Sequence, residues 1–146
     1  MFTIVMDKNK CLSKKNITTL YQGEKLVDKI RFLIPQRYGD LDLSQFVVTL
    51  KYIDQGNIIH SEKLSLSDGL YEDCMLCYYL PVTTKLTRFA GDILMRLVFE
   101  KNGQHTMYSS ETTVFIKPQK HCFGYIEDNS SDTGSSDDDG FEVVVF

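Results

Sequence analysis

The most constraining feature of this sequence is a recurring alternation of apolar and more polar residues in short segments. In residues 46–53, the side chains of Phe46, Val48, Leu50 and Tyr52 occupy every second position. Successive side chains of a β-strand point to opposite faces, so this period predicts a strand with one buried face. Such segments recur at intervals of about 8 to 12 residues, as in β-sandwiches. We expect one helical turn only, in residues 83–89, and therefore an all-β domain.

The turn residues divide the chain into about eight or nine expected strands. Pro35, Pro81 and Pro118 each end a strand, because proline has no N–H to donate to a neighbouring strand. Asn102-Gly103 is a strong hairpin signal. The expected strands are residues 2–6, 17–21, 26–34, 46–53, 58–66, 70–80, 93–100, 105–108 and 111–117. Their alternation predicts a core that contains Ile30, Phe32, Val48, Leu50, Leu97 and Phe99.

Charge separates the chain into two regions. Residues 1–125 contain all 16 Lys and Arg, whereas residues 126–146 contain seven acidic residues and no basic one. We expect a β-sandwich domain in 1–123 and an acidic Ser/Asp-rich linker in 124–140 that is flexible, because it has little apolar surface to bury. The dispersed basic residues of the body lack the clustering typical of nucleic-acid binding.

Residues 141–146 form a third expected unit, an apolar peptide with high β-propensity. Such a segment is prone to aggregate unless it has a binding partner, and the preceding acidic residues oppose aggregation by repulsion. We expect the peptide to add as a strand to an open sheet edge, in this domain or in a neighbouring subunit. The alternative is a solubilising tail whose last residues do nothing. The expected partner-binding residues are Phe141, Val143, Val144, Val145 and Phe146.

Several classes of protein are disfavoured. No apolar run reaches the roughly 18 residues of a membrane span, and the first residues lack the pattern of a signal peptide. The four cysteines are too sparse for a disulfide scaffold, which favours a reducing compartment. Cys74 and Cys77 match Cys-x-x-Cys, but a zinc site needs two more ligands, and both residues lie in an expected strand. We therefore expect buried structural cysteines and no metal or cofactor.

The polar and aromatic candidates point to no catalytic site. His60, His105 and His121 are scattered and form no recognised motif. Asp40 and Asp42 suit loop capping better than calcium binding. A group of aromatic residues could form a sugar-stacking platform, although core packing is the more common use of such residues: Tyr71, Tyr78, Tyr79 and Phe89. With no convergent acid, base and nucleophile, we expect a protein that is not an enzyme and has no small-molecule substrate.

A series of short motifs resembles the N-terminal domain of phage baseplate upper proteins and related short prophage proteins. The longest is Leu20-Tyr-Gln-Gly-Glu-Lys-Leu-Val-Asp-Lys-Ile-Arg-Phe-Leu-Ile-Pro35, followed by Tyr38-Gly-Asp-Leu-Asp-Leu-Ser44. Shorter matches lie in residues 48–52, 78–81 and 84–93, and the resemblance covers about residues 1–118. It implies an immunoglobulin-like, antiparallel β-sandwich that acts as an assembly module. The acidic arm departs from the family pattern, and the resemblance assigns no individual functional residue.

The resemblance implies a virion structural protein, assembled in the cytoplasm of the bacterial host. Its expected partners are other virion proteins of the tail baseplate and copies of itself, with no nucleic acid and no membrane. Two alternatives stay open, a capsid decoration protein of the same fold and a carbohydrate-binding adhesin for the host surface.

Overall fold

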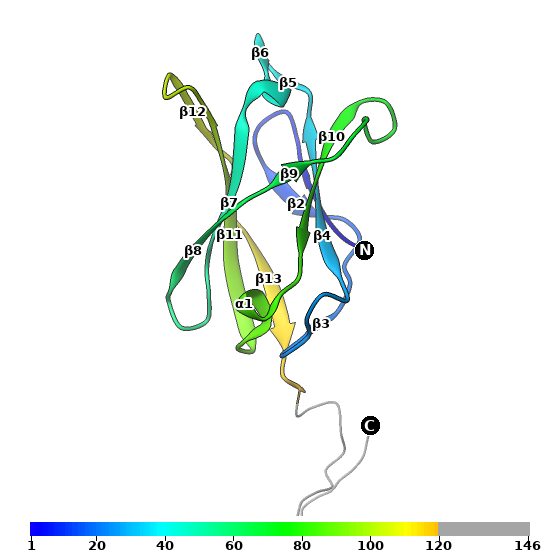
Figure 1. Cartoon of the computed structure of the whole chain (residues 1–146), viewed down its shortest axis with the longest axis vertical. Helices are drawn as coiled ribbons and strands as arrows, with labels where there is room; N and C mark the ends of the chain where they lie inside the picture. The colour runs from blue at the N-terminus through cyan, green and yellow to red at the C-terminus, as the bar shows by residue number, and fades with distance from the viewer. Residues whose placement is uncertain (120–146) are drawn as a thin grey trace, which may run out of the picture. The chain divides into compact units, whose positions relative to one another are not determined.

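The computed structural model describes residues 1–119, and its compact domain comprises Met1–Ile116. Two β-sheets face each other across one hydrophobic core (Figure 1). The expected all-β, sandwich-like fold is therefore confirmed. The expected linker 124–140 and peptide 141–146 lie outside the described residues. No helix within residues 1–119 is long and apolar enough to span a membrane.

The first sheet has the strand order β2-β1-β4-β10-β9. Its strands are β1 (Phe2–Met6), β2 (Leu12–Lys14), β4 (Lys29–Pro35), β9 (Ser65–Leu66) and β10 (Met75–Pro81). Strands β1 and β4 are parallel, with Ile4 opposite Phe32, whereas the other pairs are antiparallel. The resemblance implies a purely antiparallel sandwich, and the parallel pair β1–β4 departs from it. The pair is parallel because the chain crosses to the other sheet between β2 and β4 and then returns.

The second sheet has the order β3-β13-β11-β7-β8, and β12 pairs with β11 beside β13. Its strands are β3 (Leu20–Tyr21), β7 (Val47–Ile53), β8 (Ile59–Lys63), β11 (Gly91–Lys101), β12 (His105–Tyr108) and β13 (Thr112–Lys117). The long strand β11 pairs with β7 along one edge. Along its other edge it pairs with β13 near its start and with β12 near its end.

Ser109 and Ser110 form a bulge where the chain passes from β12 to β13. The N–H of Leu97 donates to Ser109 Oγ (2.9 Å), and the N–H of Ser109 donates to the Leu97 carbonyl (3.0 Å). Ser110 Oγ accepts the N–H of Leu12 from the other sheet (2.9 Å). The bulge therefore satisfies buried backbone groups and ties the two sheets together.

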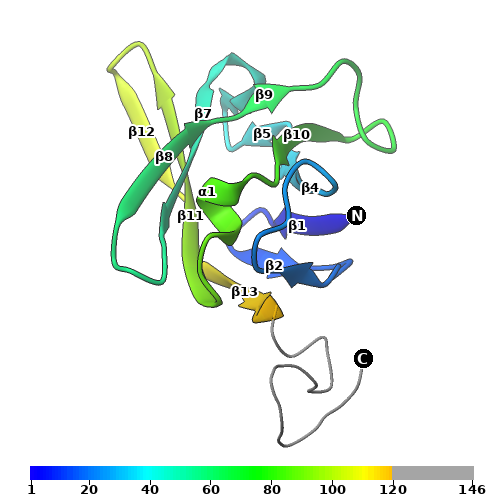
Figure 2. The same ribbon diagram turned by 60° about the horizontal axis from the view of Figure 1, so that its bottom comes forward.

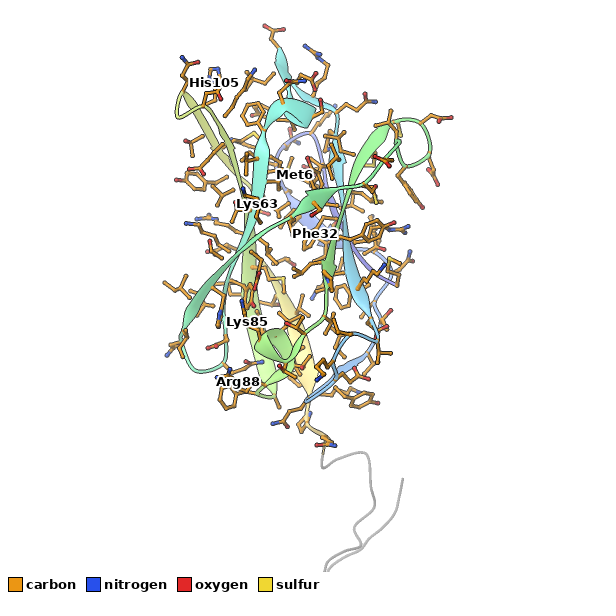
Figure 3. All side chains as sticks on the ribbon, viewed as in Figure 1. Met6, Phe32, Lys63, Lys85, Arg88 and His105 are labelled. Atoms are coloured by element: carbon orange, nitrogen blue, oxygen red, sulfur yellow. The ribbon has the colours of Figure 1, made fainter. Side chains whose placement is uncertain are left out.

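The core lies between the sheets, and all six residues expected there are at most 1% exposed. Figure 3 shows Met6 and Phe32 between the sheets. The expected helical turn is α1 (Thr84–Thr87), which buries Leu86 and lies between strands of the two sheets (Figure 2). At the other end of the domain, the hairpin β5 (Arg37–Tyr38) and β6 (Leu41–Asp42) leads into the 3₁₀ helix η1 (Leu43–Gln45).

Two expected strands are broken where the chain changes sheet. Within residues 17–21 only β3 pairs, and Ile17 is 68% exposed, because residues 15 and 16 are bonded to Thr3 of the first sheet. Within residues 58–66 the chain leaves β7 after Leu64, whose side chain is buried, and then forms β9 against β10. The short strand β2 was not expected from the sequence.

The expected strand 70–80 begins later, at Met75. Glu72 and Asp73 have positive φ angles of 51° and 60°, which no strand accommodates. The Tyr71 N–H donates to the Met75 carbonyl and closes a turn there (2.8 Å). Cys74 consequently lies exposed in the turn, and the expectation that it is a buried cysteine within a strand was wrong.

Candidate interaction surface

The outer face of the second sheet carries a row of exposed apolar side chains. Ile59 of β8, Ile53 of β7 and Leu94 of β11 are direct cross-strand neighbours, with exposed fractions of 71%, 37% and 36%. Phe115 of β13 is the diagonal neighbour of Leu94 and is 51% exposed. These four residues, here called the apolar row, cross four adjacent strands. The neighbours of each of these residues along its strand point to the core side. The strands that form one side of the core therefore also carry the apolar row on their outer face.

A polar row follows one step along the same strands. Arg96 of β11 lies opposite Lys51 of β7, which in turn lies opposite Ser61 of β8. The Arg96 guanidinium stands 5.4 Å from the centre of the Tyr108 ring, and its Nε is buried without a hydrogen-bond partner in the described structure. Tyr108 thus holds the guanidinium in place by a cation–π contact while Nε has unused donor capacity.

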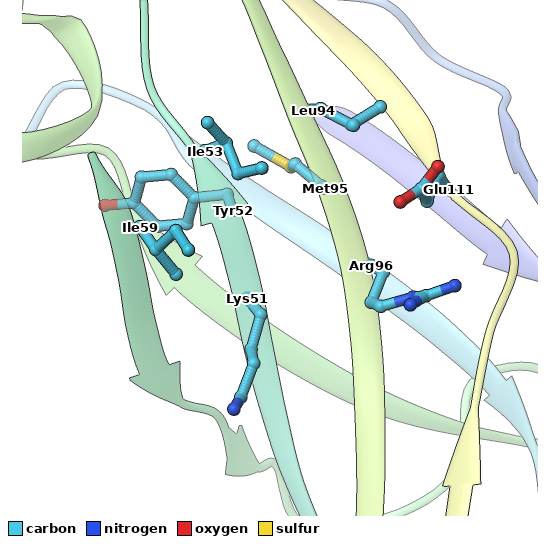
Figure 4. Close-up of a pocket in the computed structure, with 8 residues that line it drawn as sticks. All are labelled: Lys51, Tyr52, Ile53, Ile59, Leu94, Met95, Arg96 and Glu111. Atoms are coloured by element: carbon cyan, nitrogen blue, oxygen red, sulfur yellow. The ribbon is translucent and has the colours of Figure 1, made fainter. Parts of the chain in front are cut away.

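A shallow hollow of about 160 Å³ lies where the two rows meet (Figure 4). Apolar side chains line one part of it, and the basic residues Lys51 and Arg96 and the acidic Glu111 line the rest. A site of this composition accommodates an apolar side chain that is flanked by a hydrogen-bond acceptor or a carboxylate. The eight lining residues are Lys51, Tyr52, Ile53, Ile59, Leu94, Met95, Arg96 and Glu111.

A buried carboxylate closes the β7–β8 hairpin next to the apolar row. Asp54 Oδ1 accepts the N–H groups of Gly56 (2.8 Å) and Ile58 (3.0 Å), and Oδ2 lies 2.8 Å from His60 Nε2. The hydrogen bond with His60, helped by that from Ile58, lowers the pKa of Asp54 below its ordinary value. The His60 ring also stacks on Tyr52, with 4.8 Å between ring centres. This network fixes the hairpin that places Ile53 beside Ile59.

The structure separates the other candidate residues. His60 lies at the β7–β8 turn, whereas His105 lies at the β11–β12 turn at the opposite end of β7, as Figure 3 indicates for His105. Cys77 is buried in β10 and Cys74 is exposed in the preceding turn. His121 and Cys122 lie outside the described residues. Among residues 1–119, no group of three or more His, Cys, Asp or Glu side chains could hold a metal ion.

Asp42 has the capping role that was expected. Its Oδ1 accepts the N–H (3.0 Å) and the hydroxyl (2.7 Å) of Ser44, the second residue of η1. These two hydrogen bonds lower the pKa of Asp42. Asp40 is exposed in the preceding turn, where its carbonyl accepts from Arg37 (3.0 Å).

The aromatic candidates divide between core and surface. Tyr78 is buried, which raises its pKa to about 12, and Tyr79 points to the opposite face of β10, as expected. Tyr71 and Tyr79 line a second hollow of about 160 Å³ with Cys77. Basic side chains already lie over both rings, Arg31 at 4.6 Å from the centre of Tyr71 and Lys29 at 5.5 Å from that of Tyr79. Their stacking faces are thus partly occupied.

The expected binding peptide, Phe141 to Phe146, lies outside the described residues, so its role stays a prediction. Sequence reasoning did not single out the apolar row. The alternation placed Ile53 and Leu94 on the strand faces opposite the core, but nothing in one strand shows that they become neighbours in the sheet. The only sequence signal was the unusual presence of Ile53 and Leu94 at expected solvent-facing positions.

The comparisons with known proteins include a likeness to a solved structure. No family model matches the sequence, and no curated protein matches it. Among solved structures, the domain is similar to the "N-terminal domain of phage TP901-1 ORF48", with 13% sequence identity and a TM-score of 0.42. The alignment covers 80% of this chain and 94% of that domain.

Proposed function

We propose that this chain is a structural protein of a bacteriophage particle, an assembly module that docks onto other proteins of the tail baseplate. The phage setting comes from the resemblance of about residues 1–118 to the N-terminal domain of baseplate upper proteins. The docking role is supported by the apolar row, which is the observation that carries the proposal.

The apolar row has the composition of a protein-binding surface. Ile53, Ile59, Leu94 and Phe115 lie together on a flat sheet face, and Lys51 and Arg96 border them. Contiguous apolar groups with a polar rim are typical of protein–protein contacts, in which buried aliphatic and aromatic side chains supply most of the affinity. The partner surface should therefore offer apolar side chains together with a carboxylate or carbonyl group for the basic residues.

Ile53→Asp tests the docking face, and Val47→Asp is its matched control. Both residues are β-branched, lie in β7 and point to the same outer face, with exposed fractions of 37% and 46%. They are six positions apart, or roughly 20 Å along a strand. In a phage or prophage that encodes this protein, Ile53→Asp should lower its occupancy in purified particles, whereas Val47→Asp should not. Equal occupancy of both variants at the native level would refute the docking face.

The location in the particle is tested separately. Heads that lack tails and tails that lack heads are purified from lysates of assembly mutants and probed for the protein. The baseplate role requires that the protein co-purifies with tails. Its presence on filled, tailless heads alone would identify a capsid decoration protein instead.

We further propose the peptide Phe141–Phe146 as a second contact, made by strand addition to a neighbouring virion protein. Its three valines and two phenylalanines have the high β-propensity that suits that mode of binding. The carbohydrate-binding alternative has less support, because Arg31 and Lys29 already lie over Tyr71 and Tyr79. Binding of the isolated protein to host cells or wall polysaccharide would favour that alternative over the assembly role.

A further inference from the structure

Within residues 1–119, strand β8 is an open edge of the second sheet, since it pairs with β7 on one side only. The Asp54 N–H donates to the Ile58 carbonyl (3.0 Å), and the Leu64 N–H donates to the Val48 carbonyl (2.9 Å). Because backbone groups alternate in direction along an antiparallel strand, the even-numbered residues of β8 bond to β7. The N–H and C=O groups of the odd-numbered residues therefore point away from the sheet. These residues are Ile59, Ser61 and Lys63.

No other strand at the end of a sheet in residues 1–119 is as long. Strands β3 and β9 have two residues each and β2 has three. Strand β12 has four, and because Ser109 bonds to Leu97 of β11, only Thr106 and Tyr108 of β12 turn outward. Strand β8 is thus the longest free template for a further strand.

The side chains of β8 do little to block such pairing. Edge strands are usually protected by charges, prolines or bulges. Here the outer face of β8 carries Ile59, which is 71% exposed, then Ser61, and a single charge at Lys63. On the inner face, His60 is bonded to Asp54, and Glu62 forms an ion pair with Lys85 of α1 (2.8 Å).

We propose that β8 pairs with β8 of a second copy of this chain, in antiparallel orientation, with Ser61 opposite the second copy's Ser61. In this register Ile59 lies opposite the second copy's Lys63, and the reverse pair forms at the other end. All three outward-facing residues of each copy then pair, which makes about six backbone hydrogen bonds. The second sheet of one copy and the second sheet of the other then form one continuous sheet, and a two-fold axis passes between the paired Ser61 residues.

The inner-face side chains favour this register over its neighbours. With Ser61 at the centre, Glu62 of each copy lies opposite His60 of the other copy. The dimer thus contains two pairs of a carboxylate with a hydrogen-bonding imidazole. A shift of two residues in one direction places Glu62 opposite Glu62, and a shift in the other direction places His60 opposite His60. Two carboxylates in direct cross-strand positions are destabilising, and the register that pairs His60 with His60 loses both Glu62–His60 contacts. On the outer face, the aliphatic part of Lys63 covers the exposed Ile59 of the second copy.

The association should be weak, because a pairing of five residues buries less than the roughly 1,200 Å² of a stable interface. It does not rest on the proposed virion role, since it is argued from the backbone and side-chain groups of β8 alone, but the two proposals share Ile59, which also belongs to the apolar row. Within a particle, high local concentration would strengthen it.

Sedimentation equilibrium of the full chain provides the first test. From about 10 µM to about 1 mM, the weight-average mass should rise from that of one chain toward that of two. Ser61→Pro should abolish the rise, because proline removes an outward N–H that β7 does not use. The matched control Ser61→Thr retains that N–H and should associate like the native chain. Thermal melts establish that both variants are folded. A native chain that stays monomeric, or a folded Ser61→Pro variant that still associates, would refute the proposal.

Cross-linking tests the register. Opposed residues of a hydrogen-bonded antiparallel pair have Cα atoms about 5.5 Å apart, which a disulfide can bridge. Oxidised Ser61→Cys should therefore form a disulfide between the two introduced thiols, identified by peptide mass mapping. Ser13→Cys, on the exposed face of the β2 edge, should not. If Ser61→Cys gives no such link and association is instead lost on deletion of residues 141–146, the acidic arm is the occupant of the edge and β8 self-pairing is wrong.

Discussion

Truncation of Phe99 to alanine tests the assignment of inner and outer faces on which the fold and the candidate surface both depend. Phe99 is completely buried, with Val48 of β7 opposite it on one side and Met107 of β12 on the other. Phe99→Ala removes a buried ring from between three strands and leaves a cavity that β-sheet hydrogen bonds keep from collapsing. Such substitutions cost about 3 to 5 kcal/mol of unfolding free energy. For a domain of this size the midpoint of thermal unfolding should fall by roughly 10 to 25 °C.

The assay is guanidinium denaturation followed by circular dichroism, with Phe115→Ala as the matched control. Phe115 is an aromatic residue on the adjacent strand β13, but it is 51% exposed on the outer face. Its truncation should cost less than about 1 kcal/mol, since little buried surface is lost. A cost below about 1 kcal/mol for Phe99→Ala, or equal costs for the two variants, would show that the faces are assigned wrongly.

Four further predictions concern other parts of the chain. Ser109→Ala should destabilise the domain by about 1 to 3 kcal/mol in urea titrations, because it leaves the buried Leu97 N–H without an acceptor. Asp54→Asn should be less stable than the native chain at pH 6. Because the folded-state pKa of Asp54 is lowered, the native advantage is complete above about pH 4 and is lost as the pH falls through that lowered pKa, so the two denaturation curves should approach each other as the pH is lowered below 4. Thermal melts with and without a strong chelator should superimpose, and a shift of more than a few degrees would reveal a structural metal. Deletion of residues 141–146 should leave the melting of the domain unchanged but lower occupancy in particles; normal occupancy would show that this peptide has no docking role.

The longer strands and the core were predictable from local sequence. Residues 46–53 and 93–100 carry an apolar side chain at every second position, and each expected core residue in them is buried. The reason is that successive side chains of a strand point to opposite faces. Once one side chain of the segment is known to be buried, the face of every other side chain in it follows. The Asn102-Gly103 turn was equally predictable, because both residues have positive φ angles, 51° and 69°, that asparagine and glycine tolerate best.

The sheet in which each segment lies was not predictable. Residues 58–66 read as one strand, yet the chain changes sheet at Leu64, and the alternation of apolar residues continues across that crossing. The parallel pairing of β1 with β4 has no local signal either, because it depends on hydrogen bonds between segments more than twenty residues apart. A period of two is expected of a half-buried strand in either sheet, whether its neighbour is parallel or antiparallel. The period therefore does not show to which sheet a strand belongs or in which direction it pairs.

For the candidate surface, sequence determined the composition and tertiary structure determined the arrangement. The alternation assigned Ile53 and Leu94 to the faces opposite the core, so their exposure follows from sequence. Their contact with each other, and with Ile59 and Phe115, follows from cross-strand register, which depends on the β7–β8 hairpin and on the bulge at Ser109. A shift of one residue in any of these pairings would reverse the faces and disperse the row, so only the folded sheet could reveal it.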